Sequence, residues 1–392
     1  MRLIHTSDWH LGRSFHQVGL FDAQAQYLDH LVETVRSESV DAVIVSGDVY
    51  DRAMPAPDTV ALLSETVTRL VGEGVVVVLS SGNHDSAIRL GFASGLLART
   101  GLHIRSSLDS IGTPVMVGEV AVHPLPYLEP AVAAGPLGTT ERTHAGVLTA
   151  AMARVNADRV SRGGRSVVMG HAFVTGGATS DSERDISVGG VGAVHPRTFA
   201  GHDYVALGHL HGRQQVSDTV RYSGSPIALS FSEHRQTKGS WLVDLDDTGV
   251  HVEAVDAPVA RPLAVLRGDL EDLLADPRYS AAERAWCQVT VTDPVRPPAA
   301  MERLRRRFPH TLVLQFDPQG APVPVRSYAQ RATQEQPLDV CCSFLDHVRG
   351  GHAPTDAERE VLATAVEAVR TGRSGRDDEG QLAPSRRRVG AA

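Results

Sequence analysis

The sequence predicts an α/β fold of four layers, with two β-sheets packed face to face between outer helices. Three features support this prediction. The N-terminal part alternates between short apolar strands and amphipathic helices, a pattern typical of a parallel sheet with helical cover. A second set of strands is expected within residues 214–255. Prolines near residue 258 then mark the start of a small α/β domain, which is followed by a C-terminal pair of helices.

The N-terminal part is expected to contain three parallel strands separated by two helices. Strands are predicted where apolar residues run without interruption, at 2–7, 40–46 and 75–79. Helices are predicted at 21–38 and 58–71, where apolar residues recur every three or four positions.

Short apolar runs continue through the middle of the chain. They predict a pair of strands within 114–123, a helix over 143–161, and strands at 166–169 and 204–207. The glycine-rich stretch 176–192 is expected to be a loop close to the functional site. Residues 241–245 and 250–253 flank an Asp-Asp-Thr-Gly turn, which predicts a hairpin within the second set of strands.

Composition shifts divide the chain into four parts. We assign residues 1–257 to the four-layer domain, 258–320 to the small α/β domain, 321–370 to a linker and a helical partner-docking segment, and 371–392 to a disordered tail. The second C-terminal helix opens with the capping-box pattern Thr355-Asp356-Ala357-Glu358. Because little sequence remains to cover the apolar faces of these two helices, we expect them to bind a partner; packing onto their own domain is the alternative.

The composition is that of a globular protein, with 42 % hydrophobic and 21 % charged residues. No apolar run approaches the roughly 18 residues of a membrane span, and no signal peptide is evident, so a cytoplasmic protein without membrane contact is expected. Cys287, Cys341 and Cys342 show neither disulfide parity nor metal-type spacing. The formal charge of −8 argues against DNA binding through the overall field, although carboxylates around bound cations can still present a locally cationic site.

Five short motifs with metal-type ligands each follow a predicted strand. They are Asp8-Trp9-His10, Gly47-Asp48 with Asp51-Arg52, Gly82-Asn83-His84-Asp85, Gly170-His171 and Gly208-His209-Leu210-His211. Singly each motif is weak, since such histidines often only pack or hydrogen bond and Gly-Asp pairs often form turns. Together they predict a site, because ligands of parallel sheets collect beyond the carboxyl ends of the strands.

The candidate ligands form a chemically coherent set. They are Asp8, His10, Asp48, Asn83, His171, His209 and His211. Oxygen donors mixed with imidazole suit manganese, iron or zinc, whereas a structural zinc site would favour thiolates. Seven ligands exceed the needs of one ion but suit two ions about 3.5–4 Å apart that share a carboxylate, an arrangement that clamps a phosphate and activates water.

Two further residues are predicted to be catalytic. His84 directly follows a candidate ligand and is placed to stabilise the transition state or to protonate the leaving oxygen. Asp51 is expected to orient that imidazole and keep it protonated; a plain turn or capping carboxylate is the alternative. Arg52 is a candidate for contact with the substrate phosphate, or else an ion-pair partner of the nearby carboxylates.

These motifs resemble the calcineurin-like metallophosphoesterase superfamily. Within it, Asp8-Trp9-His10-Leu11-Gly12, Gly47-Asp48-Val49-Tyr50-Asp51-Arg52 and the segment Tyr222-Ser223-Gly224-Ser225-Pro226 through Phe231 resemble the bacterial SbcD nuclease subunits. The resemblance implies a first manganese ion held by Asp8, His10, Asp48 and His211, and a second held by Asp48, Asn83, His171 and His209. It also implies that His84 is the catalytic histidine.

The resemblance further implies a nuclease that acts with an SbcC-type ATPase on DNA, as a 3′-to-5′ double-strand exonuclease and a single-strand and hairpin endonuclease in recombination, repair and replication. A homodimer within a heterotetramer, a capping domain and a helical docking segment belong to this expectation. Two alternatives stay open: a phosphatase or cyclic-nucleotide phosphodiesterase with the same metals, and a scaffold subunit without activity. The first leaves the extra domain and helices without a role, and the second usually shows lost ligands.

Overall fold

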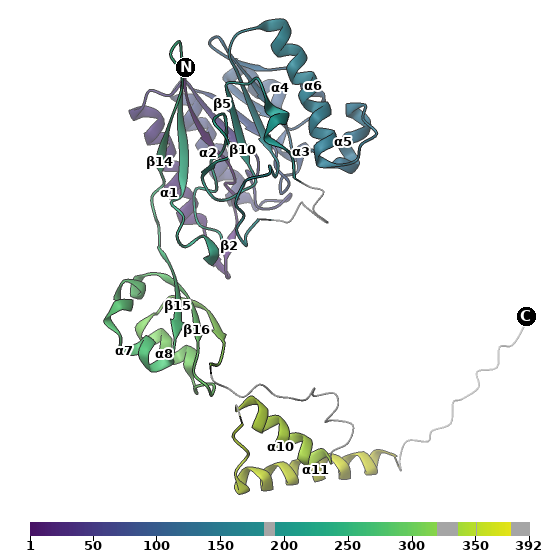
Figure 1. Ribbon diagram of the computed structural model, residues 1–392, viewed down its shortest axis with the longest axis vertical. Helices are drawn as coiled ribbons and strands as arrows, with labels where there is room; N and C mark the ends of the chain where they lie inside the picture. Colours follow the sequence, from purple (N-terminus) through teal and green to yellow (C-terminus); the bar gives the residue numbers. More distant parts are fainter. Residues whose placement is uncertain (184–192, 320–335, 350, 378–392) are drawn as a thin grey trace, which may run out of the picture. The chain divides into compact units, whose positions relative to one another are not determined.

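A computed structural model of the chain describes residues 1–183, 193–319, 336–349 and 351–377 (Figure 1). The chain divides into two compact units, residues 1–264 and 265–392, and each is described by itself. Among the described residues, no helix is both long enough and apolar enough to cross a lipid bilayer.

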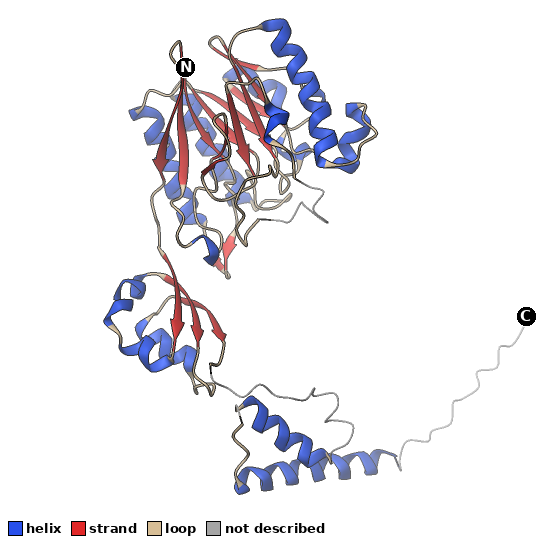
Figure 2. Cartoon of the chain, in the orientation of Figure 1, coloured by secondary structure: helices blue, strands red, loops and turns tan. Residues whose placement is uncertain are grey.

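The first unit contains two six-stranded sheets (Figure 2). The first sheet has the strand order β14-β13-β1-β4-β5-β6. Its members are β1 (Arg2–Thr6), β4 (Ala42–Ser46), β5 (Val76–Ser80), β6 (Leu102–Arg105), β13 (Gly239–Asp246) and β14 (Gly249–Asp256). β1, β4, β5 and β6 are parallel, as the N-terminal pattern predicts, whereas β13 is antiparallel to both β1 and β14.

The position of the hairpin β13–β14 corrects the expectation that residues 214–255 form the second sheet. Leu3 of β1 pairs with Val243 of β13, so the hairpin extends the first sheet. β4 occupies only one edge of β1, and β13 satisfies the main-chain groups of the other edge. The side chains of Val243 and Leu245 are buried in the core between the sheets.

The second sheet has the order β11-β12-β10-β9-β8-β7. Its members are β7 (Val115–Val117), β8 (Val120–Pro124), β9 (Ser166–His171), β10 (Tyr204–Gly208), β11 (Gln214–Gln215) and β12 (Val220–Tyr222). The four inner strands are parallel, and β7 and β11 are antiparallel edge strands. This sheet is therefore built mainly from the middle of the chain.

Helices cover the outer faces of both sheets and complete the four layers (Figures 1 and 2). The helices of this unit are α1 (Phe21–Ser37), α2 (Pro57–Gly72), α3 (Ala87–Leu90), α4 (Ser94–Leu97), α5 (Pro130–Leu137) and α6 (His144–Arg162). Residues of α1 and α2 share a core with the first sheet, and residues of α5 and α6 share one with the second. A third core, which includes Ile44, Val78, Met169 and Tyr204, lies between the sheets. The predicted α-β-β-α sandwich is confirmed.

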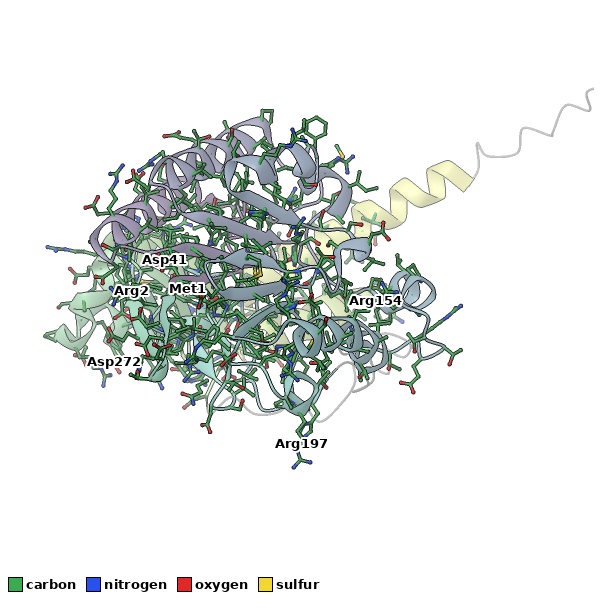
Figure 3. All side chains as sticks on the ribbon, turned by 90° about the horizontal axis from the view of Figure 1, so that it is seen from above. Met1, Arg2, Asp41, Arg154, Arg197 and Asp272 are labelled. Carbon is green, nitrogen blue, oxygen red and sulfur yellow. The ribbon has the colours of Figure 1, made fainter. Side chains whose placement is uncertain are left out.

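The two ends of the sandwich differ in character. At the amino ends of the strands, the Met1 ammonium donates to the Leu245 carbonyl at 2.9 Å and the Arg2 amide donates to Asp41 at 2.7 Å; Figure 3 shows Met1, Arg2 and Asp41 together. The motif loops leave the opposite, carboxyl ends of the strands. A small hairpin, β2 (Ser14–Phe15) and β3 (Val18–Gly19), belongs to the loop that follows β1.

The second unit begins with a small α/β fold. Its sheet has the order β15-β16-β17, and β16 and β17 are parallel. The elements are β15 (Leu263–Gly268), α7 (Leu270–Ala275), β16 (Trp286–Val291), α8 (Ala300–Arg307) and β17 (Thr311–Phe316). Leu273, Val289, Leu304 and Phe308 are fully buried, so this fold has a core of its own.

Two further helices follow, α10 (Pro337–Val348) and α11 (Asp356–Asp377). The predicted capping box is present, because the Thr355 amide donates to Glu358 at 2.9 Å and the Glu358 amide donates back to the Thr355 hydroxyl at 3.4 Å. The expected boundary of the tail at residue 371 is wrong, since α11 continues to Asp377. Extending a capped helix costs little per residue once the first turn has formed. The rest of the expected tail, and residues 321–335 of the expected linker, lie outside the described residues.

Candidate metal centre

The five motif loops leave the carboxyl ends of β1, β4, β5, β9 and β10 and meet at one end of the sandwich. Four candidate ligands have left-handed backbone conformations: Asp8 (φ 52°), His10 (φ 44°), Asp48 (φ 49°) and His209 (φ 103°). Such conformations are uncommon for residues other than glycine and cost about 1–3 kcal/mol each. Strain of this kind concentrates at functional sites.

The glycines of the motifs allow the loops to approach one another closely. A Cβ on Gly208 would lie 1.9 Å from the Ser46 carbonyl oxygen, and a Cβ on Gly82 would lie 2.2 Å from Oδ1 of Asp48. Ordinary side chains are therefore excluded at both positions. This explains why glycine precedes His209 and Asn83.

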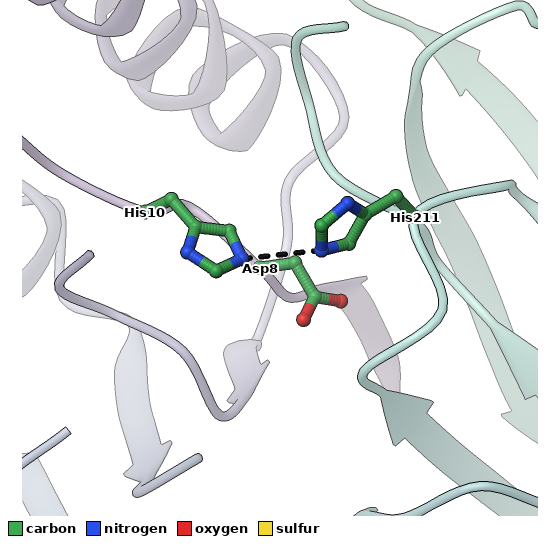
Figure 4. A group of neighbouring side chains, drawn as sticks. All are labelled: Asp8, His10 and His211. Carbon is green, nitrogen blue, oxygen red and sulfur yellow. Dashed lines mark hydrogen bonds between the residues drawn. The ribbon is translucent and has the colours of Figure 1, made fainter. Parts of the chain in front are cut away.

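One group of candidate ligands comes from the loops after β1 and β10 (Figure 4). The ligand atoms of Asp8, His10 and His211 all lie within 4.8 Å of one another, and all three side chains are buried. The Nε2 atoms of His10 and His211 face each other at 3.2 Å. Two imidazole nitrogens and a carboxylate thus converge on one small volume.

A second group forms around His171. Its Nε2 lies 3.3 Å from Oδ2 of Asp48 and 2.8 Å from Oδ1 of Asn83. Asp48 also lies 3.6 Å from Nε2 of His10, so it stands between the two groups, as expected of a shared ligand. The ring of His209 lies beside that of His171, with 5.3 Å between centroids, but His209 joins no triad of converging ligand atoms within the described part of the chain.

Hydrogen bonds determine which nitrogen of two rings carries the proton. Nδ1 of His171 is 3.0 Å from the Ser46 carbonyl, and Nδ1 of His84 is 2.8 Å from the Asp51 carbonyl. A carbonyl only accepts, so both rings are protonated at Nδ1. Nε2 of each ring is then the nitrogen that can meet a cation or a substrate. His84 packs edge-on against His10, with 4.7 Å between ring centroids.

The structure changes the expected contact of Asp51. Its main-chain carbonyl, and not its carboxylate, accepts the hydrogen bond from His84. The carboxylate instead lies 3.4 Å from Nδ1 of His10 and 3.2 Å from Arg13. Burial alone would raise the pKa of Asp51, but His10 and Arg13 hold it below its usual value. Arg52 is largely exposed and lies 3.7 Å from the same carboxylate.

The electrostatics of the centre fit a divalent cation. Burial raises the pKa of Asp8 to about 6. Burial would also raise the pKa of Asp48, but His171 and His10 hold it well below its usual value. Conversely, burial would lower the pKa of His171, and Asp48 and Asp8 raise it to about 9. Burying so many ionisable groups together destabilises the fold unless they are paired or bind a metal. The oxygen and imidazole donors present here are those that bind divalent metals.

Comparison with known proteins agrees with this chemistry. Residues 1–213 match the family model described as calcineurin-like phosphoesterase, which covers more than half of the chain. The chain belongs to the calcineurin-like phosphoesterase family. Residues 259–349 match a second model, SbcD_C, described as the type 5 capsule protein repressor C-terminal domain. As a member of this family, the protein is a hydrolase of phosphoester bonds that uses divalent metal ions.

One relative extends the likeness to most of the chain. The SbcD subunit of the nuclease SbcCD from Staphylococcus saprophyticus subsp. saprophyticus is 28 % identical over 376 residues, which cover 92 % of this chain and 96 % of the relative. A solved dimetal phosphatase from Danio rerio is 15 % identical, with coverage of 66 % of this chain and 97 % of that chain and a TM-score of 0.41. A solved protein from Thermus thermophilus is 14 % identical, with coverage of 64 % and 98 % and a TM-score of 0.38.

Sequence reasoning assigned no role to Asp85, which organises the centre of this phosphoesterase. Its partly buried carboxylate accepts hydrogen bonds from the amides of Gly82 (2.9 Å), Val49 (3.1 Å) and Tyr50 (2.9 Å). It thereby joins the loops after β4 and β5. Burial, and then the nearby Asp48, raise its pKa to about 6. The sequence feature that could have pointed to Asp85 is its place at the end of the Gly82-Asn83-His84-Asp85 motif.

The loop after β8 also borders the centre. The ring of Tyr127 lies edge-on to that of His171, with 6.2 Å between centroids. The Tyr127 amide donates to the Ser81 carbonyl at 2.7 Å, which ties this loop to the one after β5. Sequence analysis singled out no motif in this loop, and the topology brings it to the site.

Proposed function

We propose that this protein is the nuclease subunit of an SbcCD-type complex, a manganese-dependent enzyme that cleaves the phosphodiester bonds of DNA in recombination, repair and replication. In this proposal it acts as a 3′-to-5′ double-strand exonuclease and as an endonuclease on single strands and hairpins. The observation that carries the proposal is the similarity to the staphylococcal SbcD subunit, which spans 96 % of that relative and includes the second unit. A phosphatase for small substrates would leave that unit without a role.

The ligands divide between two ions in this proposal. Asp8, His10, Asp48 and His211 hold the first, and Asp48, Asn83, His171 and His209 hold the second. The distances of Asp48 from His10 and from His171 support its place as the shared ligand. Bound divalent ions would neutralise charge on the phosphate and lower the pKa of water.

In this proposal His84 is the acid that protonates the leaving oxygen. The Asp51 carbonyl holds Nδ1 of the ring, so Nε2 is the nitrogen that can face a substrate. Asp51 then acts as the residue that orients His84, through its main chain. Its carboxylate, near His10 and Arg13, fixes the loop from which that carbonyl projects.

The activity is tested with the purified full chain and Mn²⁺. We expect cleavage of a DNA hairpin and release of nucleotides from the 3′ ends of end-labelled duplexes, with little turnover of para-nitrophenyl phosphate or a cyclic nucleotide. His84→Gln should lower DNA cleavage by about 10²–10⁴-fold. His251→Gln, on the edge strand β14, is the matched control. Turnover of the small esters alone, or no activity with any divalent metal, would overturn the proposal.

Metal analysis tests the shared ligand. Asp48→Ala should lose both ions, because each site loses a carboxylate. Mn²⁺ content after dialysis gives the answer directly. Retention of two ions by this variant would show that Asp48 does not bridge them.

An exposed apolar surface supports a homodimer. Met54, Ile88, Phe92 and Leu96 are 72 %, 88 %, 80 % and 69 % exposed. The loop with Met54 lies beside α3, since Arg89 donates to the Ala53 carbonyl at 3.5 Å. Apolar patches of this kind usually mark protein interfaces.

Sedimentation analysis distinguishes the two states of assembly. Phe92→Arg should convert the dimer into a monomer, and Val160→Arg, at an equally exposed valine of α6, should not. A wild-type chain that sediments as a monomer at micromolar concentration would contradict the proposal.

The helices α10 and α11 are proposed to dock on an SbcC-type ATPase. Phe344, Val361 and Val369 are 51 %, 69 % and 60 % exposed, which supports an apolar face that is covered by a partner. Phe344→Asp should abolish co-purification with the ATPase, and Val132→Asp on α5 is the control. Equal co-purification of both variants would exclude this surface. The proposed substrate and partner place the protein in the cytoplasm, which cell fractionation can check.

A further inference from the structure

The ring of His211 lies at the end of a chain of hydrogen bonds that begins outside the ligand set. Its Nδ1 is 2.5 Å from Oγ of Ser182, and Ser182 Oγ in turn donates to Oε1 of Glu233. Glu233 follows the Gly-Ser-Pro segment and is 1 % exposed. Ser182 belongs to the glycine-rich stretch that was expected near the site. Neither residue has a role in the proposed reaction so far.

Which group donates in each of these hydrogen bonds follows from the protons that each group carries. Glu233 forms an ion pair with the buried Lys238, and the Leu229 amide donates to it at 3.0 Å, so the group is a carboxylate and only accepts. Ser182 gives its one proton to Glu233. Its oxygen must therefore accept the Nδ1 proton of His211.

The consequence is a defined tautomer of His211. With the proton on Nδ1, the lone pair of Nε2 is available, and Nε2 is the atom that faces His10 at 3.2 Å. The main chain of His211 is held separately, since its amide donates to Glu183 at 2.8 Å and its carbonyl accepts from Lys238 at 2.8 Å. Within the described part of the chain, Ser182 is the one residue that hydrogen bonds to Nδ1 of the ring.

We propose that Glu233 is a positioning residue, which acts through Ser182 to hold the His211 ring in the tautomer and orientation that a divalent cation requires. The inference rests on the proposed metal site. Main-chain carbonyls accept the Nδ1 protons of His171 and His84. In His211 the side chain of Ser182, which is itself bonded to Glu233, accepts this proton instead. These side chains can be removed by substitution, whereas main-chain carbonyls cannot. Partners of this kind raise metal affinity without touching the metal.

Calorimetric titration of the metal-free full chain with Mn²⁺ tests the role. Ser182→Ala should weaken the binding of one of the two ions by about 10–100-fold and leave the other unchanged. Glu233→Gln should have the same effect, and Ser182→Thr, which keeps a hydroxyl, should restore binding. The matched control is Ser230→Ala, because Ser230 donates to Glu233 at 3.2 Å but makes no described contact with Ser182 or His211.

A spectroscopic measurement distinguishes positioning from a general loss of structure. In the ¹⁵N-histidine-labelled, metal-free chain, the signal absent from His211→Ala belongs to His211. It should report protonation at Nδ1 in the wild type and a mixture of tautomers in Ser182→Ala. If Glu233→Gln fails to fold, Ser182→Ala alone tests the positioning role, because this variant keeps the ion pair between Glu233 and Lys238.

The possible outcomes distinguish a failure of the positioning role from a failure of the proposed metal site on which it rests. If His211→Ala binds two ions as tightly as the wild type, the assignment of the metal site itself is wrong. If His211→Ala loses one ion while folded Ser182→Ala binds both with unchanged affinity and an unchanged tautomer, the positioning role is overturned and the site stands.

Discussion

The backbone strain of the candidate ligand loops is offset by hydrogen bonds to nearby carboxylates. Asp48 adopts a φ of 49°, and its Oδ1 accepts the His84 amide at 2.8 Å. The next two amides of its loop donate to Asp85, and the His209 amide donates to Asp8 at 3.0 Å. Charge-assisted bonds of this kind are stronger than neutral ones. The same carboxylates that favour a cation therefore also hold the loops in shape.

Asp85→Asn tests this account at a residue that is not a candidate ligand. An amide has one acceptor oxygen, so at least one of the three amides that donate to Asp85 loses its partner. We expect a loss of about 1–3 kcal/mol in the free energy of unfolding, measured by urea denaturation of the metal-free chain near pH 7.5, together with weaker Mn²⁺ binding. The exposed Asp247→Asn is the control. Equal stability of the two variants would contradict this role of Asp85.

The two sheets make direct contact where their strands end at the candidate metal centre. Oγ of Ser46, the last residue of β4, donates to the Ala206 carbonyl of β10 at 2.9 Å. Its own carbonyl accepts from His171 of β9. This contact requires glycine at position 208, where no Cβ fits. The ligand loops of both sheets are thereby brought within reach of one another.

Gly208→Ala should separate these strands. Its Cβ would meet a main-chain oxygen and not a flexible side chain, so the backbone must shift. We expect a loss of roughly 1–3 kcal/mol in stability, as for other overpacked sites, and a fall in Mn²⁺ affinity. Gly72→Ala, at the end of α2, has open space around the added Cβ and should be neutral or stabilising by up to about 1 kcal/mol. Thermal unfolding compares the stability of the two variants. An equal change in both would show that the close approach of Gly208 to the Ser46 carbonyl is unimportant for stability.

The sandwich as a whole depends on histidines that are buried in their neutral form. His5 of β1 bonds across the sheets to the Tyr204 hydroxyl at 2.9 Å and to the Leu207 carbonyl at 3.1 Å. His202 bonds to the Ser166 hydroxyl at 2.8 Å and to Asn156 at 3.0 Å. Burial lowers the pKa of His5 to about 3 and that of His202 to about 4.

These histidines predict sensitivity to acid. Between pH of about 6.5 and 4 the two rings take up protons in the unfolded chain but not in the folded chain, so their contribution to the free energy of unfolding falls as the pH falls, by up to about 1.4 kcal/mol per pH unit for each ring. Asp8 and Asp85, whose pKa values are raised to about 6, contribute in the opposite direction, so the comparison between His202→Asn and the wild type isolates the ring. Above about pH 6.5 both rings are neutral in the folded and in the unfolded chain, so their contribution to the free energy of unfolding no longer changes with pH. Urea denaturation with a chelator over this range measures the slope. His202→Asn should show a shallower slope, and an unchanged slope would exclude His202 as a cause.

Local patterns were sufficient to predict the four layers and to indicate where the candidate ligands meet. Strand and helix periodicity mark the elements, and the parallel connections carry every motif loop to the same end of the sandwich. Asp8, Asp48 and His171 could be named in this way because each directly follows an apolar strand, and the structure brings their ligand atoms together.

Other features were decided by contacts between distant parts of the chain. The hairpin 239–256 joins the first sheet because β1 has a free edge, which no local pattern records. Asp51 supports His84 with its carbonyl, a group that every residue has, so its identity gives no indication of that bond. Ser182 and Glu233 lie 51 residues apart in sequence, and only the folded chain brings them together behind His211. Periodicity reports how a segment packs, whereas hydrogen bonds across the fold depend on where the whole backbone places their partners.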